Sequence, residues 1–461
     1  MPSGDRTAVV VVTWNKAARV RDCLRSLEAL SDGDLDVFVV DNASTDGTAA
    51  MIREEFPGVA LLVNDENLGG AGGFNCGMRH ALDRGYGFVW LLDDDVTVEP
   101  GALRALREVM AERPDCGVVG SKIYAAGTGL AFIQELGAFI DWENAAITLN
   151  RNGEFDHGRI AETVEVDYVP ACSMLVRTEA VEGRELFDPS YFLYWDDIDF
   201  CHRLTLAGWQ VLACGASVVN HFASGERAGT SLTLYYALRN SLYFMKQYQM
   251  DSFEACAQRR LERAAERAGL FRTLGREALV GTMEGSVRDA LAMVRGRVED
   301  MPVVPLATKP PEKLASAKTL VLVAQRPHIF FQCRAAVEDL LGGSEVEYLV
   351  NERYVPDLQA VEGARLIAYP SGTFSADSTA MQAYAGRYER VVLLGKDGLF
   401  RNAVRAALSL GAGETFFADF YGNVIPLAPR TLDEYAAHTE AFRSQWTADL
   451  EQSKLLLVDV S

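Results

Sequence analysis

The sequence predicts an α/β protein: a mostly parallel, Rossmann-like sheet in the N-terminal half, then a helical segment, then a second and smaller α/β domain. Short apolar runs alternate with amphipathic stretches over residues 8–219, which is typical of strands and helices in a largely parallel sheet. Residues 231–299 have a helical pattern, first aromatic and then rich in arginine. Beyond a cluster of prolines, further apolar runs of strand length alternate with helical stretches.

The N-terminal elements begin with a βαβ unit. Four apolar runs have the length of strands, at residues 8–12, 37–40, 59–63 and 88–92. Between the first two, Val20, Leu24 and Leu27 lie on one helical stripe. Ligands of open α/β sheets bind beyond the carboxyl ends of the strands, so the polar segments that follow these runs are the candidate binding segments.

Prolines mark the main boundary of the chain. Pro302, Pro305, Pro310 and Pro311 cannot continue a helix and stiffen an extended linker. Beyond them, strands are predicted at residues 320–324, 346–350, 366–369, 391–394 and 415–418. We therefore predict four parts: an N-terminal domain (1–230), a helical extension (231–300), a proline-rich linker (301–317) and a C-terminal α/β domain (318–461). Three roles stay open for the last: self-association into a homo-oligomer, docking of a glycan or partner, or a second nucleotide-dependent activity.

Composition and charge exclude some classes of function. The chain has 461 residues, 49% hydrophobic and 23% charged, which is the balance of a folded protein. A net charge of -20 argues against a nucleic-acid binder, which needs clustered Lys and Arg. No apolar run reaches the roughly 18–20 residues of a membrane-spanning helix, so any membrane contact would be peripheral. The arginine-rich stretch at residues 259–276 fits a solvated face or, alternatively, a contact with a membrane surface or lipid phosphate.

The apolar run at residues 88–92 ends in three carboxylates, Asp93, Asp94 and Asp95. Adjacent like charges repel unless a cation compensates them, so the triplet favours a hard divalent ion such as Mg²⁺ or Mn²⁺. Alternate side chains of an extended segment point the same way, which puts Asp93 and Asp95 on one side and Asp94 on the other. An isolated triplet is more often a solvated loop or a helix cap, so the assignment depends on the neighbouring motifs.

Two more polar segments follow predicted strands. In DNASTDGT, Asp41 can accept hydrogen bonds from a nucleobase or ribose, while Asp46 is mainly a cap of the next helix. In NLGGAGGFNCG, residues 67–77, glycines let a ligand approach the backbone before a helix that starts at Met78. A plain flexible loop is the alternative. This run is not a dinucleotide fingerprint, because it follows the third strand rather than the first.

The segment YFLYWDDIDF interleaves aromatic rings with carboxylates. Aromatic faces commonly line sugar sites, so Tyr194 and Trp195 are candidate acceptor contacts, and a carboxylate beside them can take the proton of an attacking hydroxyl. Acidic residues also favour a helix N-terminus. Both interpretations can hold if Asp197 faces the acceptor while Asp196 and Asp199 cap or orient the helix.

A histidine follows the apolar run at residues 216–219. A lone histidine is more often structural than functional. At the end of a strand, however, the imidazole of His221 could complete a metal site begun by Asp93 and Asp95.

In this order, the motifs resemble the inverting glycosyltransferases of family two, which have the GT-A fold. The motifs are VVVVTWN, DNASTDGT, NLGGAGGFNCG, LLDDDV, the aromatic run with WDDIDF, then NHF and YYALRN. The match covers residues 5–245, about half of the chain, and leaves the C-terminal domain uncovered. The combination looks most like bacterial galactofuranosyltransferases, with rhamnosyltransferases of cell-wall and O-antigen synthesis as close relatives.

The resemblance implies a role for each candidate residue and makes residues 1–230 the catalytic domain. Asp197 would be the catalytic base, and Asp93, Asp95 and His221 would hold Mn²⁺ or Mg²⁺. The residues that would bind the donor are Thr13, Asn15, Asp41, Asn67, Gly72, Asp93, Asp94 and Arg239. The residues that would bind the acceptor are Tyr194, Trp195 and Asp196.

The expected activity is metal-dependent, inverting transfer of a sugar from a UDP- or dTDP-sugar to a hydroxyl of a glycan or lipid-linked acceptor. Galactofuranose or rhamnose is the expected sugar. The expected location is the cytoplasm, at the inner face of the membrane. Two other classes stay open. A nucleotidyltransferase would use the carboxylates for two-metal chemistry, although residues 9–16 lack a glycine- and basic-rich triphosphate loop. A non-catalytic binding or scaffold protein could retain a transferase-like fold.

Overall fold

The computed structural model of the chain describes residues 6–30, 35–126, 132–156, 158–222, 230–299, 301–306, 313–323, 337–352, 355, 365–369, 382–395, 400–419 and 423–457. The chain divides into two compact units. Unit 1 comprises Met1–Gly225, Arg239–Phe253 and Ala292–Met301, and unit 2 comprises Glu226–Leu238, Glu254–Leu291 and Pro302–Ser461. Both units contain parts of the predicted helical extension, and the three boundaries between the four predicted parts stay a prediction. Pro310 and Pro311 of the predicted linker lie outside the described residues.

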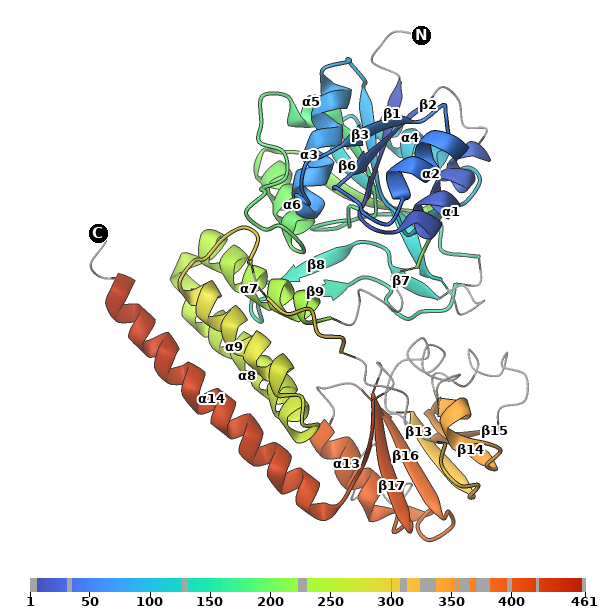
Figure 1. The fold of residues 1–461 in the computed structure, drawn as a ribbon, viewed down its shortest axis with the longest axis vertical. Helices are drawn as coiled ribbons and strands as arrows, with labels where there is room; N and C mark the ends of the chain where they lie inside the picture. The colour runs from blue at the N-terminus through green and yellow to red at the C-terminus, as the bar shows by residue number, and fades with distance from the viewer. Residues whose placement is uncertain are drawn as a thin grey trace. The chain divides into compact units, whose positions relative to one another are not determined.

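Unit 1 is built on a mixed sheet with a mostly parallel centre (Figure 1). Among the described residues its strand order is β10-β12-β6-β11-β4-β1-β2-β3, with β5 paired to β12 and β7 to β6. The strands are β1 Thr7–Thr13, β2 Leu35–Asp41, β3 Ala60–Val63, β4 Phe88–Asp93, β5 Val96–Val98, β6 Cys116–Ala125, β7 Ile133–Glu135, β10 Thr163–Glu165, β11 Ser173–Arg177 and β12 Gln210–His221. A separate hairpin joins β8 Ala138–Asp141 to β9 Ala146–Leu149. The predicted α/β class is confirmed, while β11 runs antiparallel to both neighbours.

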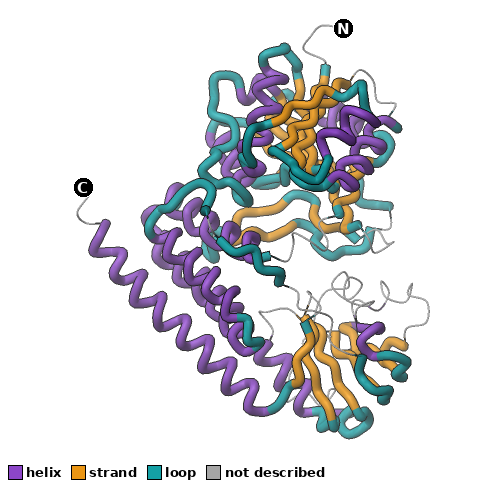
Figure 2. Tube along the Cα trace, in the orientation of Figure 1, coloured by secondary structure: helices purple, strands orange, loops and turns teal. Residues whose placement is uncertain are grey.

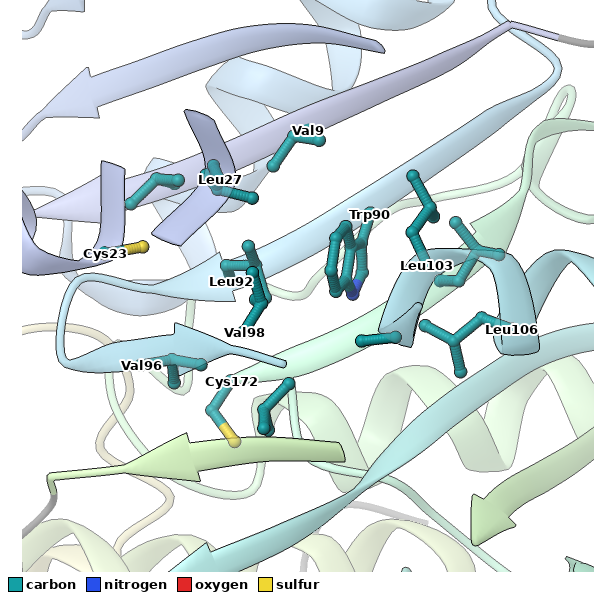
Figure 3. Packing of buried hydrophobic residues seen from close by; sticks show 14 of the residues in the cluster. Val9, Cys23, Leu27, Trp90, Leu92, Val96, Val98, Leu103, Leu106 and Cys172 are labelled. Carbon is teal, nitrogen blue, oxygen red and sulfur yellow. The ribbon is translucent and has the colours of Figure 1, made fainter. Parts of the chain in front are cut away.

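Helices cover both faces of this sheet because its central strands are buried on both sides. The unit 1 helices are α1 Ala17–Glu28, α2 Thr48–Glu55, α3 Gly69–Leu82, α4 Ala102–Glu112, α5 Thr178–Val181 and α6 Asp196–Leu206, and α7 Ser231–Tyr248 contributes its second half. Val9 and Val11 face α1 and α4, where a core cluster forms around Trp90 and Leu92 (Figure 3). Because strand side chains alternate between faces, Val10 and Val12 face α3 instead.

The glycine-rich segment is helical, so the prediction of a glycine loop that passes into a helix at Met78 is wrong. Helix α3 already begins at Gly69. An added Cβ at Gly73 would lie 2.6 Å from Val12 Cγ1, and one at Gly77 would lie 2.2 Å from Val10 Cγ1. The four-residue spacing puts both glycines on one helix face, so they let α3 lie close against β1.

Unit 2 contains a second α/β sheet, as predicted. Its strand order among the described residues is β15-β14-β13-β16-β17-β18, parallel except for β18. The strands are β13 Thr319–Val323, β14 Val346–Asn351, β15 Arg365–Tyr369, β16 Arg390–Gly395, β17 Glu414–Asp419 and β18 Val424–Pro426. The helices are α8 Phe253–Thr273, α9 Glu277–Leu291, α13 Phe400–Ser409 and α14 Pro429–Leu457, and the longest of them, α14, lies against α8 and α9 (Figure 2). In the described part of the chain, no helix is long and apolar enough to cross a membrane.

Candidate active site

The candidate site lies where the parallel strands of unit 1 end. In the register of these strands, Val12 of β1 pairs with Asp93 of β4, and Thr13 pairs with Asp41 of β2. The chain then turns at Asp94 and Asp95 and continues as β5, whose Val96 pairs with His221 at the end of β12. Strand pairing therefore gathers side chains that are far apart in the sequence.

Three of these side chains form a cluster with the composition of a metal site. Ligand atoms of Asp93, Asp95 and His221 all lie within 4.8 Å of one another. His221 Nε2 lies 3.3 Å from Asp95 Oδ1, and the backbone N–H of Phe222 donates to Asp95 O. Carboxylate and imidazole ligands suit Mn²⁺ and related divalent ions, so the residues present fit the expected ion.

Burial and neighbouring charges shift the pKa of each side chain in the cluster. Burial and the neighbouring Asp95 charge raise the pKa of Asp93 to about 7. Burial also tends to raise the pKa of Asp95, but the hydrogen bond and charge of His221, together with Lys16, outweigh it and lower that pKa. For His221, burial tends to lower the pKa, and the bond and charge of Asp95 raise it overall. The cluster thus holds more negative charge than its own residues can balance, which favours a cation.

Asp94 faces the end of β1 rather than the cluster. Thr13 Oγ1 donates to Asp94 Oδ2 at 2.8 Å, and Trp14 N donates to the same oxygen at 3.4 Å. Lys16 Nζ donates to Asp94 Oδ1 at 3.0 Å and also contacts Asp95. Thr13 and Asp94, both predicted to bind the donor, are therefore bonded to each other. Their predicted contacts with the nucleotide stay a prediction.

The end of β2 offers one open acceptor. Asp41 is 1% exposed, and its Oδ1 accepts from Ser44 N at 3.0 Å. Its Oδ2 is buried and has no hydrogen-bond partner among the described residues. Such an orphaned carboxylate oxygen costs free energy unless a ligand donates to it. Asn15 lies beside it: its N–H donates to Ser44 Oγ, and its Oδ1 accepts from Thr45 N at 2.7 Å.

Two further residues that are predicted to bind the donor, Asn67 and Gly72, lie at the start of α3. Asn67 Oδ1 accepts from Gly69 N at 2.9 Å. An added Cβ at Gly72 would lie 2.5 Å from Leu68 Cβ, so in this structure the position packs against its own helix turn. Asp46, predicted to cap the next helix, accepts from Thr48 N at 3.0 Å and so bonds the first turn of α2, but the N-cap position itself is Gly47.

Asp197 lies in the first turn of α6 with its carboxylate held by the backbone. It accepts from the N–H groups of Ile198, at 2.9 Å, and Ala171. Burial and the charge of Glu135 raise the pKa of Asp197 to about 7. Burial and the charge of Asp197 likewise raise the pKa of Asp196 to about 7. A carboxylate with a pKa near neutrality has the properties of a general base.

The aromatic candidates and Asp199 differ in their surroundings. Tyr194 is 36% exposed, whereas Trp195 is buried and packs on Phe244. Asp199 accepts from Arg203 Nε at 2.7 Å and Tyr248 Oη at 2.7 Å, so it holds α6 in place, as predicted for an orienting carboxylate.

Arg239 bonds the backbone of the segment that precedes α6, and no bond to the acidic cluster is seen among its described contacts. It is 1% exposed, and its guanidinium donates to the backbone carbonyls of Ser190, Tyr191 and Gly296. Its predicted contact with the diphosphate stays a prediction and would need a different side-chain conformation.

Three site residues were missed by the sequence reasoning. Lys16 could have been found, because a cation beside three carboxylates compensates their repulsion. Gln134 Oε1 lies 3.2 Å from His221 Nδ1. Next to it in the sequence, burial raises the pKa of Glu135 to about 7. No sequence signal marks Gln134 and Glu135, since they lie on a three-residue strand within an apolar stretch.

Comparison with known proteins identifies the family of this part of the chain. The model of the family "Glycosyl transferase family 2" matches residues 8–182. This stretch contains β1, β2, α3 and the acidic turn. Residues 8–182 belong to glycosyl transferase family 2. The predicted family is thereby confirmed for this stretch of the chain.

Two curated relatives belong to mycobacteria. An N-acetylglucosaminyl-diphospho-decaprenol L-rhamnosyltransferase of Mycobacterium tuberculosis is 28% identical over 242 residues, which are 48% of this chain and 77% of the relative. The galactofuranosyltransferase GlfT2 of Mycolicibacterium smegmatis is 25% identical over 272 residues, 52% of this chain and 41% of the relative. Both matches leave about half of this chain uncovered.

Solved structures give a weaker likeness. GalNAc-T7, crystallised with UDP, GalNAc and Mn²⁺, superimposes with a TM-score of 0.44 and 13% identity, covering 57% of this chain. The chain spans about half the length, 51%, of that structure.

Proposed function

We propose that this glycosyltransferase is metal-dependent and inverting, and that it transfers galactofuranose or rhamnose from a UDP- or dTDP-sugar. The acceptor is a hydroxyl of a glycan or lipid-linked sugar in cell-surface polysaccharide synthesis, at the inner, cytoplasmic face of the membrane. The proposal rests on the closeness of the half-buried Asp197 to the cluster of Asp93, Asp95 and His221, since the charge of Asp93 acts on the Asp197 carboxylate. The names of the mycobacterial relatives favour these two sugars.

Asp197 acts as the base. Its carboxylate takes the proton of the acceptor hydroxyl, the oxygen attacks the anomeric carbon, and the nucleotide diphosphate leaves from the opposite face. The attack inverts the anomeric configuration, and no covalent enzyme intermediate is needed. Two backbone N–H bonds keep the Asp197 carboxylate in one orientation, which satisfies the positional demand on a general base.

Asp93, Asp95 and His221 would hold Mn²⁺ or Mg²⁺. The bound ion would offset negative charge on the departing diphosphate. Asp41 Oδ2 accepts from the base or ribose of the donor, which satisfies an oxygen that has no partner in the described part of the chain. Lys16 compensates Asp94 and Asp95 in the structure and is close enough to the cluster to meet a phosphate.

A panel of nucleotide sugars tests this proposal. Each candidate donor is added with Mn²⁺, and the melting temperature of the protein is recorded, since a ligand of the folded state stabilises it by mass action. We expect a UDP- or dTDP-sugar to raise the melting temperature only when Mn²⁺ is present. Equal stabilisation by nucleoside triphosphates would favour a nucleotidyltransferase instead. No stabilisation by any nucleotide would favour a scaffold protein.

A further inference from the structure

The backbone just before α6 is held in an unfavourable conformation. Phe192, Tyr194 and Trp195 have φ angles of 63°, 63° and 70°, in the left-handed region that non-glycine residues avoid. Such a conformation costs free energy at each of these residues, so the segment of residues 190–195 persists only because its surroundings hold it. We call this segment the aromatic loop.

Asn240 holds the aromatic loop through its side-chain amide. Asn240 Nδ2 lies 3.0 Å from the carbonyl oxygen of Tyr191, 2.8 Å from that of Leu193 and 2.8 Å from that of Tyr194. An amide has two N–H hydrogens, so the three carbonyls share them. Asn240 Oδ1 accepts from Arg239 Nε at 2.8 Å, which fixes the amide with its nitrogen toward the loop.

Arg239 extends the same set of bonds. Its Nη2 lies 3.4 Å from Ser190 O and 3.2 Å from Tyr191 O, and its Nη1 donates to Gly296 O at 2.8 Å. Gly296 in turn donates its N–H to Ser190 O at 2.6 Å. All three guanidinium nitrogens are therefore engaged with the backbone or with Asn240.

The start of α3 holds the loop at its middle. Gly70 N donates to Phe192 O at 3.0 Å. Gly69 has a φ of 72°, and an added Cβ there would lie 2.2 Å from Phe192 O. This contact gives Gly69 two reasons to be glycine: its backbone conformation and the close approach of the loop. The carbonyls of residues 190–194 thus all have partners.

The backbone of the aromatic loop is bonded directly to the helix turn that carries the proposed base, Asp197. Trp195 O accepts from Asp199 N at 3.0 Å, and this bond closes the first turn of α6. Asp197 lies within that turn, so a shift of the loop backbone moves its carboxylate. A displacement of about 1 Å at a reacting group can lower a rate by about 100-fold.

We propose that Arg239 and Asn240 are positioning residues for sugar transfer: they hold the aromatic loop in its left-handed conformation and thereby aim Asp197 at the acceptor. This inference rests on the proposed role of Asp197 as the base. It assigns to Arg239 a role through the loop backbone instead of a contact with the donor diphosphate.

Two substitutions and one control test the inference. Asn240→Asp replaces the side-chain amide, which donates hydrogen bonds, by a carboxylate of the same shape, which accepts them. Arg239→Lys keeps the positive charge but loses the planar guanidinium with its several N–H groups. The control is Arg177→Lys, because Arg177 also donates to backbone carbonyls, those of Met110, Arg113 and Cys116, but at the opposite end of β4. Hydrogen exchange of the peptide over residues 190–199 and steady-state kinetics with varied donor and acceptor are measured for all three.

We expect both test variants to lose exchange protection over residues 190–199 and to bind UDP or dTDP with Mn²⁺ as the wild type does. For Asn240→Asp we expect kcat to fall about 100-fold while the KM for the donor changes by less than about threefold. Arg177→Lys should change neither the exchange of this peptide nor kcat.

Unchanged exchange over residues 190–199 in both variants would overturn the inference, as would wild-type kcat in a variant whose loop has lost protection. A raised donor KM with kcat retained would instead make Arg239 a donor contact. The proposed function fails separately, when the wild type transfers no sugar from any donor. The exchange measurement still decides whether Arg239 and Asn240 hold the loop.

Discussion

His221 Nε2 lies 3.3 Å from Asp95 Oδ1. The contact exists because β12 pairs with β5 in a register that places His221 opposite Val96, the residue after Asp95. Gln134 fixes the other ring nitrogen, Nδ1, so that Nε2 faces the carboxylates. A histidine oriented in this way presents the nitrogen that a divalent ion would need.

Loss of the His221 or the Asp95 side chain should therefore remove most of the effect of metal on nucleotide binding. In wild-type protein we expect Mn²⁺ to strengthen binding of UDP or dTDP. In His221→Ala and Asp95→Ala this gain should shrink by more than about 10-fold. Calorimetric titration with and without Mn²⁺ measures it. Glu112→Gln, which removes an exposed charge at the end of α4, is the control. A gain from Mn²⁺ that survives both alanine variants would remove this cluster as the metal site.

Asp197→Asn should stop transfer without weakening donor binding. The amide keeps the size of the side chain but cannot take a proton, so kcat should fall by roughly 10²–10⁴. The affinity for nucleotide with Mn²⁺ should stay within about twofold of wild type, because the donor side is left intact. Near-normal turnover by Asp197→Asn would show that another group is the base.

The same residue predicts the pH profile. Burial and the charge of Glu135 raise the pKa of Asp197 to about 7, and a general base must be ionised, so kcat/KM should fall as the pH drops below about 7. Glu135→Gln removes a nearby negative charge, which makes ionisation of Asp197 easier and should move this limb to lower pH. A limb that stays in place in Glu135→Gln would contradict the assignment of this pKa to Asp197.

How far the sequence predicts the site depends on the range of the contacts involved. Asp93 and Asp95 could be paired from the alternation of side chains on a strand, and this required only three adjacent residues. The bond between Thr13 and Asp94 depends on the register of β1 and β4, which no local pattern reveals. The same holds for Gln134, whose contact with His221 follows from long-range strand pairing.

The glycine run shows why a local pattern can mislead. Glycine lowers helix propensity by about 1 kcal/mol relative to alanine, so five glycines in eleven residues predict a loop. Close packing of α3 on β1 outweighs that cost. Arg239 is a similar case, because an arginine in a nucleotide enzyme suggests a phosphate contact, while its backbone partners come from residues far away in the sequence.

Substitution of the packed glycines should destabilise unit 1. Gly73→Ala and Gly77→Ala add a Cβ within 2.6 and 2.2 Å of valine methyl groups, and such overpacking costs about 1–3 kcal/mol. Gly281→Ala and Gly285→Ala, in α9, bring the added Cβ within 4 Å of no described atom and should stabilise the fold by up to about 1 kcal/mol. Calorimetric unfolding of the four variants gives the comparison. Equal effects in both helices would show that α3 does not depend on this packing.

We propose that the carboxylates of unit 1 support transfer of a sugar from a nucleotide diphosphate. The direct measurement is product formation from UDP-galactofuranose and dTDP-rhamnose with a glycan acceptor, with Mn²⁺ or with a chelator, in wild type and Asp197→Asn. We predict a glycoside of inverted anomeric configuration from the wild type with Mn²⁺, and none with the chelator or in the variant. Metal-independent transfer, or a product of retained configuration, would rule out the proposed metal-dependent, inverting mechanism.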